Sequence, residues 1–222
     1  MYIADGKTNG PAFFWPDGKR IAVMVTFDYD AEFLRISRAK SKGTTIGFTD
    51  FSRGQYGPHE GLARCLDMLD TMNIKSTFFV PGAVIETYRD TVEEIHRRGG
   101  EVQMSSHTFK SLSVEENLMI AKAHAERGAD IIKIVNTAKT VDELPVYVEA
   151  IQKILHMTDK KLLVLVSGPG QLIRYIGPSI GVCMYLCVQS RGALDNPPEQ
   201  PLVKQIKAVR DNIIFYSEKE EQ

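Results

Sequence analysis

A lysine lies inside an apolar stretch of the sequence, where a charged side chain is not expected. Residues 130–135, with the sequence DIIKIV, have the β-branched content of a buried strand. An ammonium group in such surroundings is costly, and burial lowers the pKa of a lysine toward neutrality. A neutral amine is the nucleophile that Schiff-base chemistry needs. Lys133 is therefore a candidate catalytic residue; the alternative is a lysine whose amine reaches solvent from the end of the strand.

His107 follows the preceding apolar stretch, residues 101–106. If the two stretches are neighbouring parallel strands, the imidazole lies within reach of a substrate bound at Lys133. A histidine beside an amine nucleophile can move protons during the reaction. The sequence predicts His107 and Lys133 as a catalytic pair, although an isolated histidine is more often a hydrogen-bonded structural residue.

Three carboxylates follow an earlier apolar stretch, in the sequence TFDYDAE at residues 26–32. They are Asp28, Asp30 and Glu32. At the tip of a parallel strand, paired carboxylates can act as a general base and as a metal ligand. The alternative is that they cap the following loop and face water.

Residues 12–107 resemble the polysaccharide deacetylase family, on the segments TFDYD at 26–30, STFFVPG at 76–82 and RRGGEV at 97–102. The resemblance implies Asp28 as a base and Asp30 as a ligand of a divalent metal, together with two histidines spaced H-x-x-x-H. His107 matches the first histidine, but position 111 is a serine. Catalytic zinc sites generally take three protein ligands. The metal ligand set is therefore unknown, and a metal-dependent deacetylase-like hydrolase is the second alternative.

Residues 101–213 resemble the C-terminal half of type I 3-dehydroquinate dehydratase, on MSSHTF at 104–109, ERGADIIKI at 126–134 and SGPG at 167–170. In that family of (β/α) barrels, a lysine forms an imine with a ketone substrate and a histidine moves protons for loss of water. The resemblance implies Lys133 and His107 as the catalytic residues. It also implies Arg174 and Gln200 as the residues that bind a small-molecule carboxylate substrate, with no cofactor.

The two resemblances meet near residue 100, so that each parental site is cut. The dehydratase family takes further acidic and arginine residues from its first strands, which here belong to the deacetylase-like part. We therefore expect a chimeric or divergent barrel scaffold with little or no turnover, recombined, engineered or naturally fused. A Schiff-base lyase of the dehydratase type is the alternative.

The elements that must position these residues alternate between short β-branched runs and longer stretches of helical period. This order predicts a single α/β domain over residues 1–222, with a (β/α) barrel-like parallel sheet of about six units, closed or partly open. Ser113 and Glu116 predict a capping box. Residues 33–58 show no sustained period and predict a long loop. The six strand candidates are residues 20–27, 76–80, 101–106, 130–135, 162–167 and 182–188.

The charge and the hydrophobic pattern of the sequence exclude some classes of binding partner. The net charge of −1 gives no basic stripe, so nucleic acid is not an expected partner. No apolar run approaches the roughly 20 residues that cross a bilayer, and residues 1–16 do not have the pattern of a secretory signal, so we expect a cytoplasmic protein without membrane contact. An open barrel would expose a strand edge, which predicts a possible homodimer.

Overall fold

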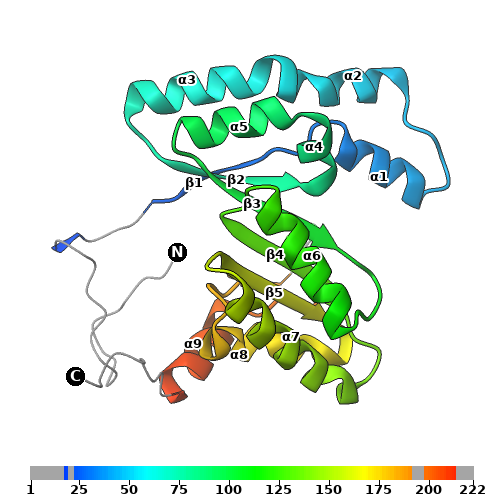
Figure 1. The fold of residues 1–222 in the computed structure, drawn as a ribbon, viewed down its shortest axis with the longest axis vertical. Coiled ribbons are helices and arrows are strands. Elements are labelled where there is room, and N and C mark those ends of the chain that lie inside the picture. The colour runs from blue at the N-terminus through cyan, green and yellow to red at the C-terminus, as the bar shows by residue number, and fades with distance from the viewer. Residues whose placement is uncertain (1–17, 20–22, 192–197, 214–222) are drawn as a thin grey trace.

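Five parallel strands form one sheet in the order β1-β2-β3-β4-β5 in a computed structural model of the protein, which describes residues 18–19, 23–191 and 198–213 (Figure 1). The α/β, barrel-like parallel sheet predicted from the sequence is confirmed. Every strand pairs with its neighbour in the chain, and no pairing joins β1 to β5 among the described residues. The strands are β1 (Val25–Asp28), β2 (Ser76–Pro81), β3 (Glu101–His107), β4 (Ile131–Thr137) and β5 (Lys161–Ser167).

Helices connect successive strands, and most of them lie on one side of the sheet (Figure 1). Between β1 and β2 lie α1 (Phe33–Ser41), α2 (Phe48–Tyr56), a π-helical turn (Gly57–Gly61) and α3 (Leu62–Met72). The next connections are α4 (Gly82–Thr87), α5 (Arg89–Arg97), α6 (Val114–Glu126) and α7 (Leu144–Met157), with a 3₁₀ turn at Val141–Glu143. After β5 come 3₁₀ turns at Gly168–Leu172 and Gly177–Ile180, with α8 (Ile173–Ile176) between them, and then α9 (Val203–Asn212).

The two faces of the sheet differ because side chains alternate along each strand. One face packs against the helices and supplies fully buried apolar side chains, among them Phe78, Met104, Ile132 and Ile134. The opposite face, which is the interior of a barrel, carries Gln103, His107 and Lys133 among its apolar neighbours. The fold therefore assigns the chemistry to one face and the main core to the other.

The sixth predicted strand, residues 182–188, is wrong. This segment makes one backbone hydrogen bond to β5, from Cys183 N to Leu162 O, and a single bridge between Val188 and Leu202. It then places Met184 and Leu186 at the cavity on the inner face of the sheet. Its apolar content covers the space that further strands would fill in a closed barrel.

The predicted loop at residues 33–58 is also wrong, because it contains the two nine-residue helices α1 and α2. Helix α1 has no buried residue, and Gly54 is the only buried residue of α2. Both helices nevertheless carry apolar residues at helical spacing, Phe33 and Ile36 in α1 and Phe48 and Phe51 in α2, which the sequence interpretation overlooked. No helix in the described part of the chain combines the length and apolar character needed to span a membrane.

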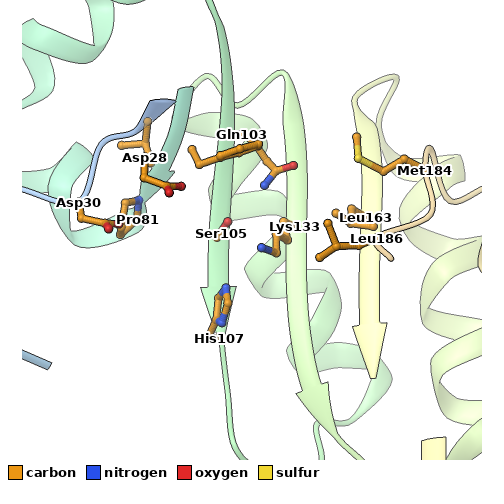
Figure 2. A pocket seen from close by; sticks show the side chains of 12 residues that line it. Asp28, Asp30, Pro81, Gln103, Ser105, His107, Lys133, Leu163, Met184 and Leu186 are labelled. Atoms are coloured by element: carbon orange, nitrogen blue, oxygen red, sulfur yellow. The ribbon is translucent and has the colours of Figure 1, made fainter. Parts of the chain in front are cut away.

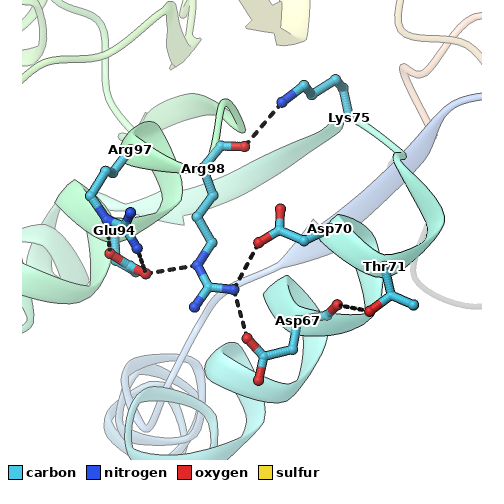
Figure 3. Close-up of polar contacts among 7 residues, drawn as sticks. All are labelled: Asp67, Asp70, Thr71, Lys75, Glu94, Arg97 and Arg98. Carbon is cyan, nitrogen blue, oxygen red and sulfur yellow. Dashed lines mark hydrogen bonds and ion pairs between the residues drawn. The ribbon is translucent and has the colours of Figure 1, made fainter.

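Helices α3 and α5 are joined by ion pairs centred on Arg98 (Figure 3). Its Nη1 donates to Asp67 Oδ1 at 2.6 Å and to Asp70 Oδ2 at 3.0 Å, and its Nε donates to Glu94 Oε1 at 2.7 Å. Arg97 contacts Glu94 within α5 and bonds to neither carboxylate of α3. Arg98 therefore connects two helices, whereas Arg97 supports one.

We expect Arg98→Gln to lower the melting temperature more than Arg97→Gln, because it leaves Asp67 and Asp70 without their shared cation. Hydrogen bonds from Arg97 and Arg98 lower the pKa of Glu94 from 4.5 to about 2. A carboxylate whose pKa is lower in the folded state adds stability above its ordinary pKa and loses it as the pH falls toward the folded value. Thermal melts of both variants between pH 7 and pH 2 should show the loss in each variant shrinking below about pH 4.5, as Glu94 becomes protonated. Equal losses at neutral pH would contradict the bridging role.

Candidate active site

A cavity of about 370 Å³ opens on the inner face of the sheet, toward the carboxyl ends of the strands (Figure 2). It is walled by all five strands and by the segment after α8. Its polar lining consists of Asp28, Asp30, Gln103, Ser105, His107 and Lys133, and its apolar lining of Phe79, Val80, Pro81, Leu163, Met184 and Leu186. A concave site with a few converging polar groups is the usual form of a small-molecule site.

The strand register brings the predicted pair together. Ser105 on β3 pairs with Lys133 on β4, and His107 lies two residues farther along β3, on the same face. Figure 2 shows the imidazole and the Lys133 amine directed into the same cavity. The structure thus places His107 and Lys133 on neighbouring strands, at one site.

The surroundings of Lys133 favour a neutral amine. The side chain is half-buried, and within the described part of the chain its Nζ has no hydrogen bond or ion pair. Burial lowers the pKa of Lys133 below 10.5, the negative charge of Asp28 opposes this change, and the positive charge of Arg174 adds to it. A lysine with a lowered pKa has a larger fraction of nucleophilic amine at neutral pH.

His107 lies at the solvent-exposed rim of the cavity. Partial burial of its ring, with the nearby cations Lys133 and Arg174, lowers its pKa from 6.5 to about 4. At neutral pH the imidazole is therefore uncharged and able to accept a proton. A neutral base beside an amine whose pKa is lowered suits imine chemistry.

Asp28 and Asp30 lie across the cavity from Lys133, at the end of β1 (Figure 2). Burial and the neighbouring Asp28 raise the pKa of Asp30, and Arg38 partly offsets this rise. The residues do not fit a metal: among the described residues, no group of three or more His, Cys, Asp or Glu side chains could hold an ion. Ser111 bonds to Glu143 Oε2 at 2.5 Å and so belongs to a different cluster.

Arg174 and Gln200 are both buried, but neither lines the cavity. Arg174 donates from Nε to Val166 O at 2.8 Å and from Nη2 to Ser167 Oγ at 3.1 Å. These bonds fix the guanidinium at the end of β5, and its charge still acts on His107 and Lys133. Their predicted role in substrate binding stays a prediction.

We expect Asp28→Asn to lower the pKa of Lys133 further, because it removes the negative charge that holds this pKa up. Competitive acetylation across a pH series, read at Lys133 by mass spectrometry, measures the fraction of neutral amine. The labelling curve of Asp28→Asn should move to lower pH. Asp30→Asn is the matched control, since Asp30 is not among the charges that act on Lys133. An unmoved curve for Asp28→Asn would contradict the coupling.

The family model described as polysaccharide deacetylase matches residues 38–164, which is more than half of the chain. The chain belongs to the polysaccharide deacetylase family. The matched segment begins later than the resemblance noted in the sequence and continues past residue 100, through β3 and β4. A deacetylase-family chain thus carries His107 and Lys133 within the part that the family model matches. None of the curated proteins compared with it matches the chain.

Comparison with solved structures supports the same fold. The chain is similar to 3-dehydroquinate dehydratase from Geobacillus kaustophilus, with a TM-score of 0.63 and 18% identity over 84% of this chain and 66% of that one. The type I enzyme from Clostridium difficile gives 0.58 and 20%, over 68% and 60%, and the enzyme from Enterococcus faecalis gives 0.54 and 14%, over 85% and 80%. The chain therefore spans 60% and 66% of the length of the first two enzymes. These similarities show a shared barrel-like fold.

Sequence reasoning missed Gln103, Ser105, Met184 and Leu186 as parts of the site. Gln103 and Ser105 could have been found, because they precede His107 by four and two residues and so point to the same face of the strand. Met184 and Leu186 lay in the segment interpreted as a sixth strand. No local pattern indicates that this segment turns across the sheet.

Proposed function

We propose that this chain forms a Schiff base between Lys133 and the carbonyl group of a small-molecule carboxylate, as a lyase that removes water from a hydroxy-keto acid. The observation that carries the proposal is the shared cavity, in which the Lys133 amine lies without a polar partner in the described structure, beside the neutral base His107. The similarity of the fold to 3-dehydroquinate dehydratases supports the choice of reaction.

The neutral Lys133 Nζ attacks the carbonyl carbon, and the resulting carbinolamine loses its oxygen as water to give a protonated imine. His107 then accepts a proton from the carbon next to the imine. The electron pair left behind expels the hydroxyl group from the following carbon, and the hydroxyl leaves as water with the proton that His107 carries. Hydrolysis of the imine releases the unsaturated product and restores the amine.

The charges around Lys133 suit this sequence of steps. The amine must be neutral to attack, and burial with Arg174 lowers its pKa in that direction. The protonated imine carries a positive charge, which Asp28 can stabilise from the opposite wall of the cavity. Arg174 provides positive charge for a substrate carboxylate from the end of β5.

Borohydride reduction of the intact chain in the presence of 3-dehydroquinate tests the proposal. A reduced imine adds the mass of the ligand less that of one oxygen atom, and proteolysis locates the adduct. An adduct on the peptide that contains Lys133 supports the proposal. A folded sample that gains no mass overturns Schiff-base formation with this ketone.

A second candidate is a recombined or divergent scaffold with little or no turnover. The observation in its favour is the open sheet, whose five strands leave His107 at the rim exposed to solvent. The hydrogen bonds of Arg174 Nε and Nη2 also favour this candidate, because these donors bind the protein itself and not a substrate. Formation of the Lys133 adduct without conversion of 3-dehydroquinate to its dehydrated product would support this candidate.

A further inference from the structure

A second cavity lies between helices α1 and α2, outside the Lys133 site. It has a volume of about 260 Å³. Arg35, Arg38 and Lys42 line it together with one carboxylate, Asp50. Arg35 pairs with Asp50 at 3.1 Å. In the described part of the chain, the side chains of Arg38 and Lys42 have no hydrogen bond or ion pair.

Arg35, Arg38 and Lys42 are exposed, and helix packing does not account for their grouping on one side. Arg35, Arg38 and Lys42 are three and four residues apart and therefore follow one side of the helix, where like charges repel. Helix α1 buries no residue that would offset this repulsion. Basic residues near a helix C-terminus interact favourably with its dipole, and this effect applies equally to Lys40, which does not line the cavity.

Contacts between α1 and α2 hold the two helices that form the walls of the cavity. A Cβ atom on Gly54 of α2 would lie 2.4 Å from the Cα of Glu32, so only glycine allows the approach of α2 to the start of α1. Glu32 is itself buried and accepts a hydrogen bond of 2.8 Å from Tyr88. The ion pair between Arg35 and Asp50 joins the two helices a second time.

The cationic cavity lies near the Lys133 site, and shared lining residues link the two. Arg35 and Arg38 also line a cavity of about 300 Å³, together with Asp28 and Asp30. The same two aspartates line the cavity that contains Lys133. A ligand that occupies the Lys133 site can therefore extend toward α1.

We propose that the cavity between α1 and α2 binds an oxyanion, a carboxylate or a phosphate group, through Arg38 and Lys42. The side chains of both cations are free to donate charge-assisted hydrogen bonds to such a group, since neither has a hydrogen bond or ion pair in the described structure. Arg35 is the third cation, and its pairing with Asp50 leaves the recess with a net positive charge. The proposal goes beyond the Schiff-base chemistry and does not depend on it.

Isothermal titration of the full chain with inorganic phosphate, and separately with succinate, tests the proposal at low ionic strength. We expect saturable binding in the millimolar range, weakened about tenfold by Arg38→Gln and by Lys42→Gln. Lys40→Gln is the matched control, because it removes one charge from the same helix outside the cavity. Tighter binding of phosphate would identify a phosphorylated ligand, and tighter binding of succinate a carboxylate.

Two results would overturn the proposal. One is the absence of saturable binding for both probes, and the other is equal weakening by Lys40→Gln, which would indicate a general charge effect. Circular dichroism of each variant verifies that the helices remain, and two separate cavity variants guard against misfolding of one. Because no carbonyl compound is present, this test can fail while the Lys133 adduct forms.

Discussion

Lys133→Ala is expected to abolish the adduct that borohydride traps with 3-dehydroquinate. Lys133 is the only lysine among the described residues that line the reaction cavity, so no other amine there can form the imine. The variant should remain folded, because alanine removes a half-buried amine that has no hydrogen bond or ion pair in the described structure. Intact mass before and after reduction measures the loss, which should be complete.

Two further variants test whether the adduct depends on the neutral amine of Lys133. Lys133→Arg keeps the positive charge but does not supply a neutral amine, so it should also give no adduct. Lys139→Ala removes an exposed lysine just beyond the end of β4 and should form the adduct like the unaltered chain. An adduct of unchanged mass and yield in Lys133→Ala would place the reactive amine elsewhere and contradict the proposed site.

The sheet could be predicted because its five strands are short, largely apolar runs separated by helical stretches. The capping box of Ser113 and Glu116 is also confirmed. Residues 182–188, which were predicted as a sixth strand, have the same apolar composition as a strand. Composition does not determine whether the backbone of a segment pairs with a neighbouring strand. After one hydrogen bond to β5, tertiary packing draws Met184 and Leu186 over the inner face.

The site residues could be predicted where a polar or charged residue interrupts an apolar stretch. Lys133 stands out because a charge interrupts an apolar strand, and His107 follows from its place on the neighbouring strand. Helices α1 and α2 were missed although Phe48 and Phe51 are spaced as on one side of a helix. The close approach at Gly54 and the ion pair between Arg35 and Asp50, which hold the two helices together, depend on tertiary structure. The hydrogen bonds of Arg174 to the end of β5 likewise depend on tertiary structure, and no sequence pattern predicts them.

The arrangement of the cavity bears on the two resemblances that meet near residue 100. Asp28 and Asp30 come from one side of this position, and His107 and Lys133 from the other. The Asp28 charge opposes the lowering of the Lys133 pKa, so the two parts of the chain are coupled within one site. Whatever the origin of the chain, the chemistry must be tested on the whole cavity rather than on either half.

His107→Asn is expected to slow conversion of 3-dehydroquinate by about 10²- to 10⁴-fold while leaving the Lys133 adduct intact. Asparagine can hydrogen-bond at the same position but cannot accept and return a proton. Protonation of the imidazole should add a loss of activity as the pH drops through about 4, beyond the loss that protonation of Lys133 causes. This acid limb should be absent from the residual activity of the variant.

The split between adduct formation and turnover separates a proton carrier from a structural histidine. If His107 only supported the fold, its replacement would lower the yield of the adduct and the rate of conversion together. His156→Asn is the matched control, since His156 is exposed on α7 and bonds only to Gln152 O, outside the cavity. Equal conversion rates for His107→Asn and His156→Asn would contradict proton transfer by His107. Another base would then have to act with Lys133, and Asp28 is the carboxylate that faces Lys133 across the cavity.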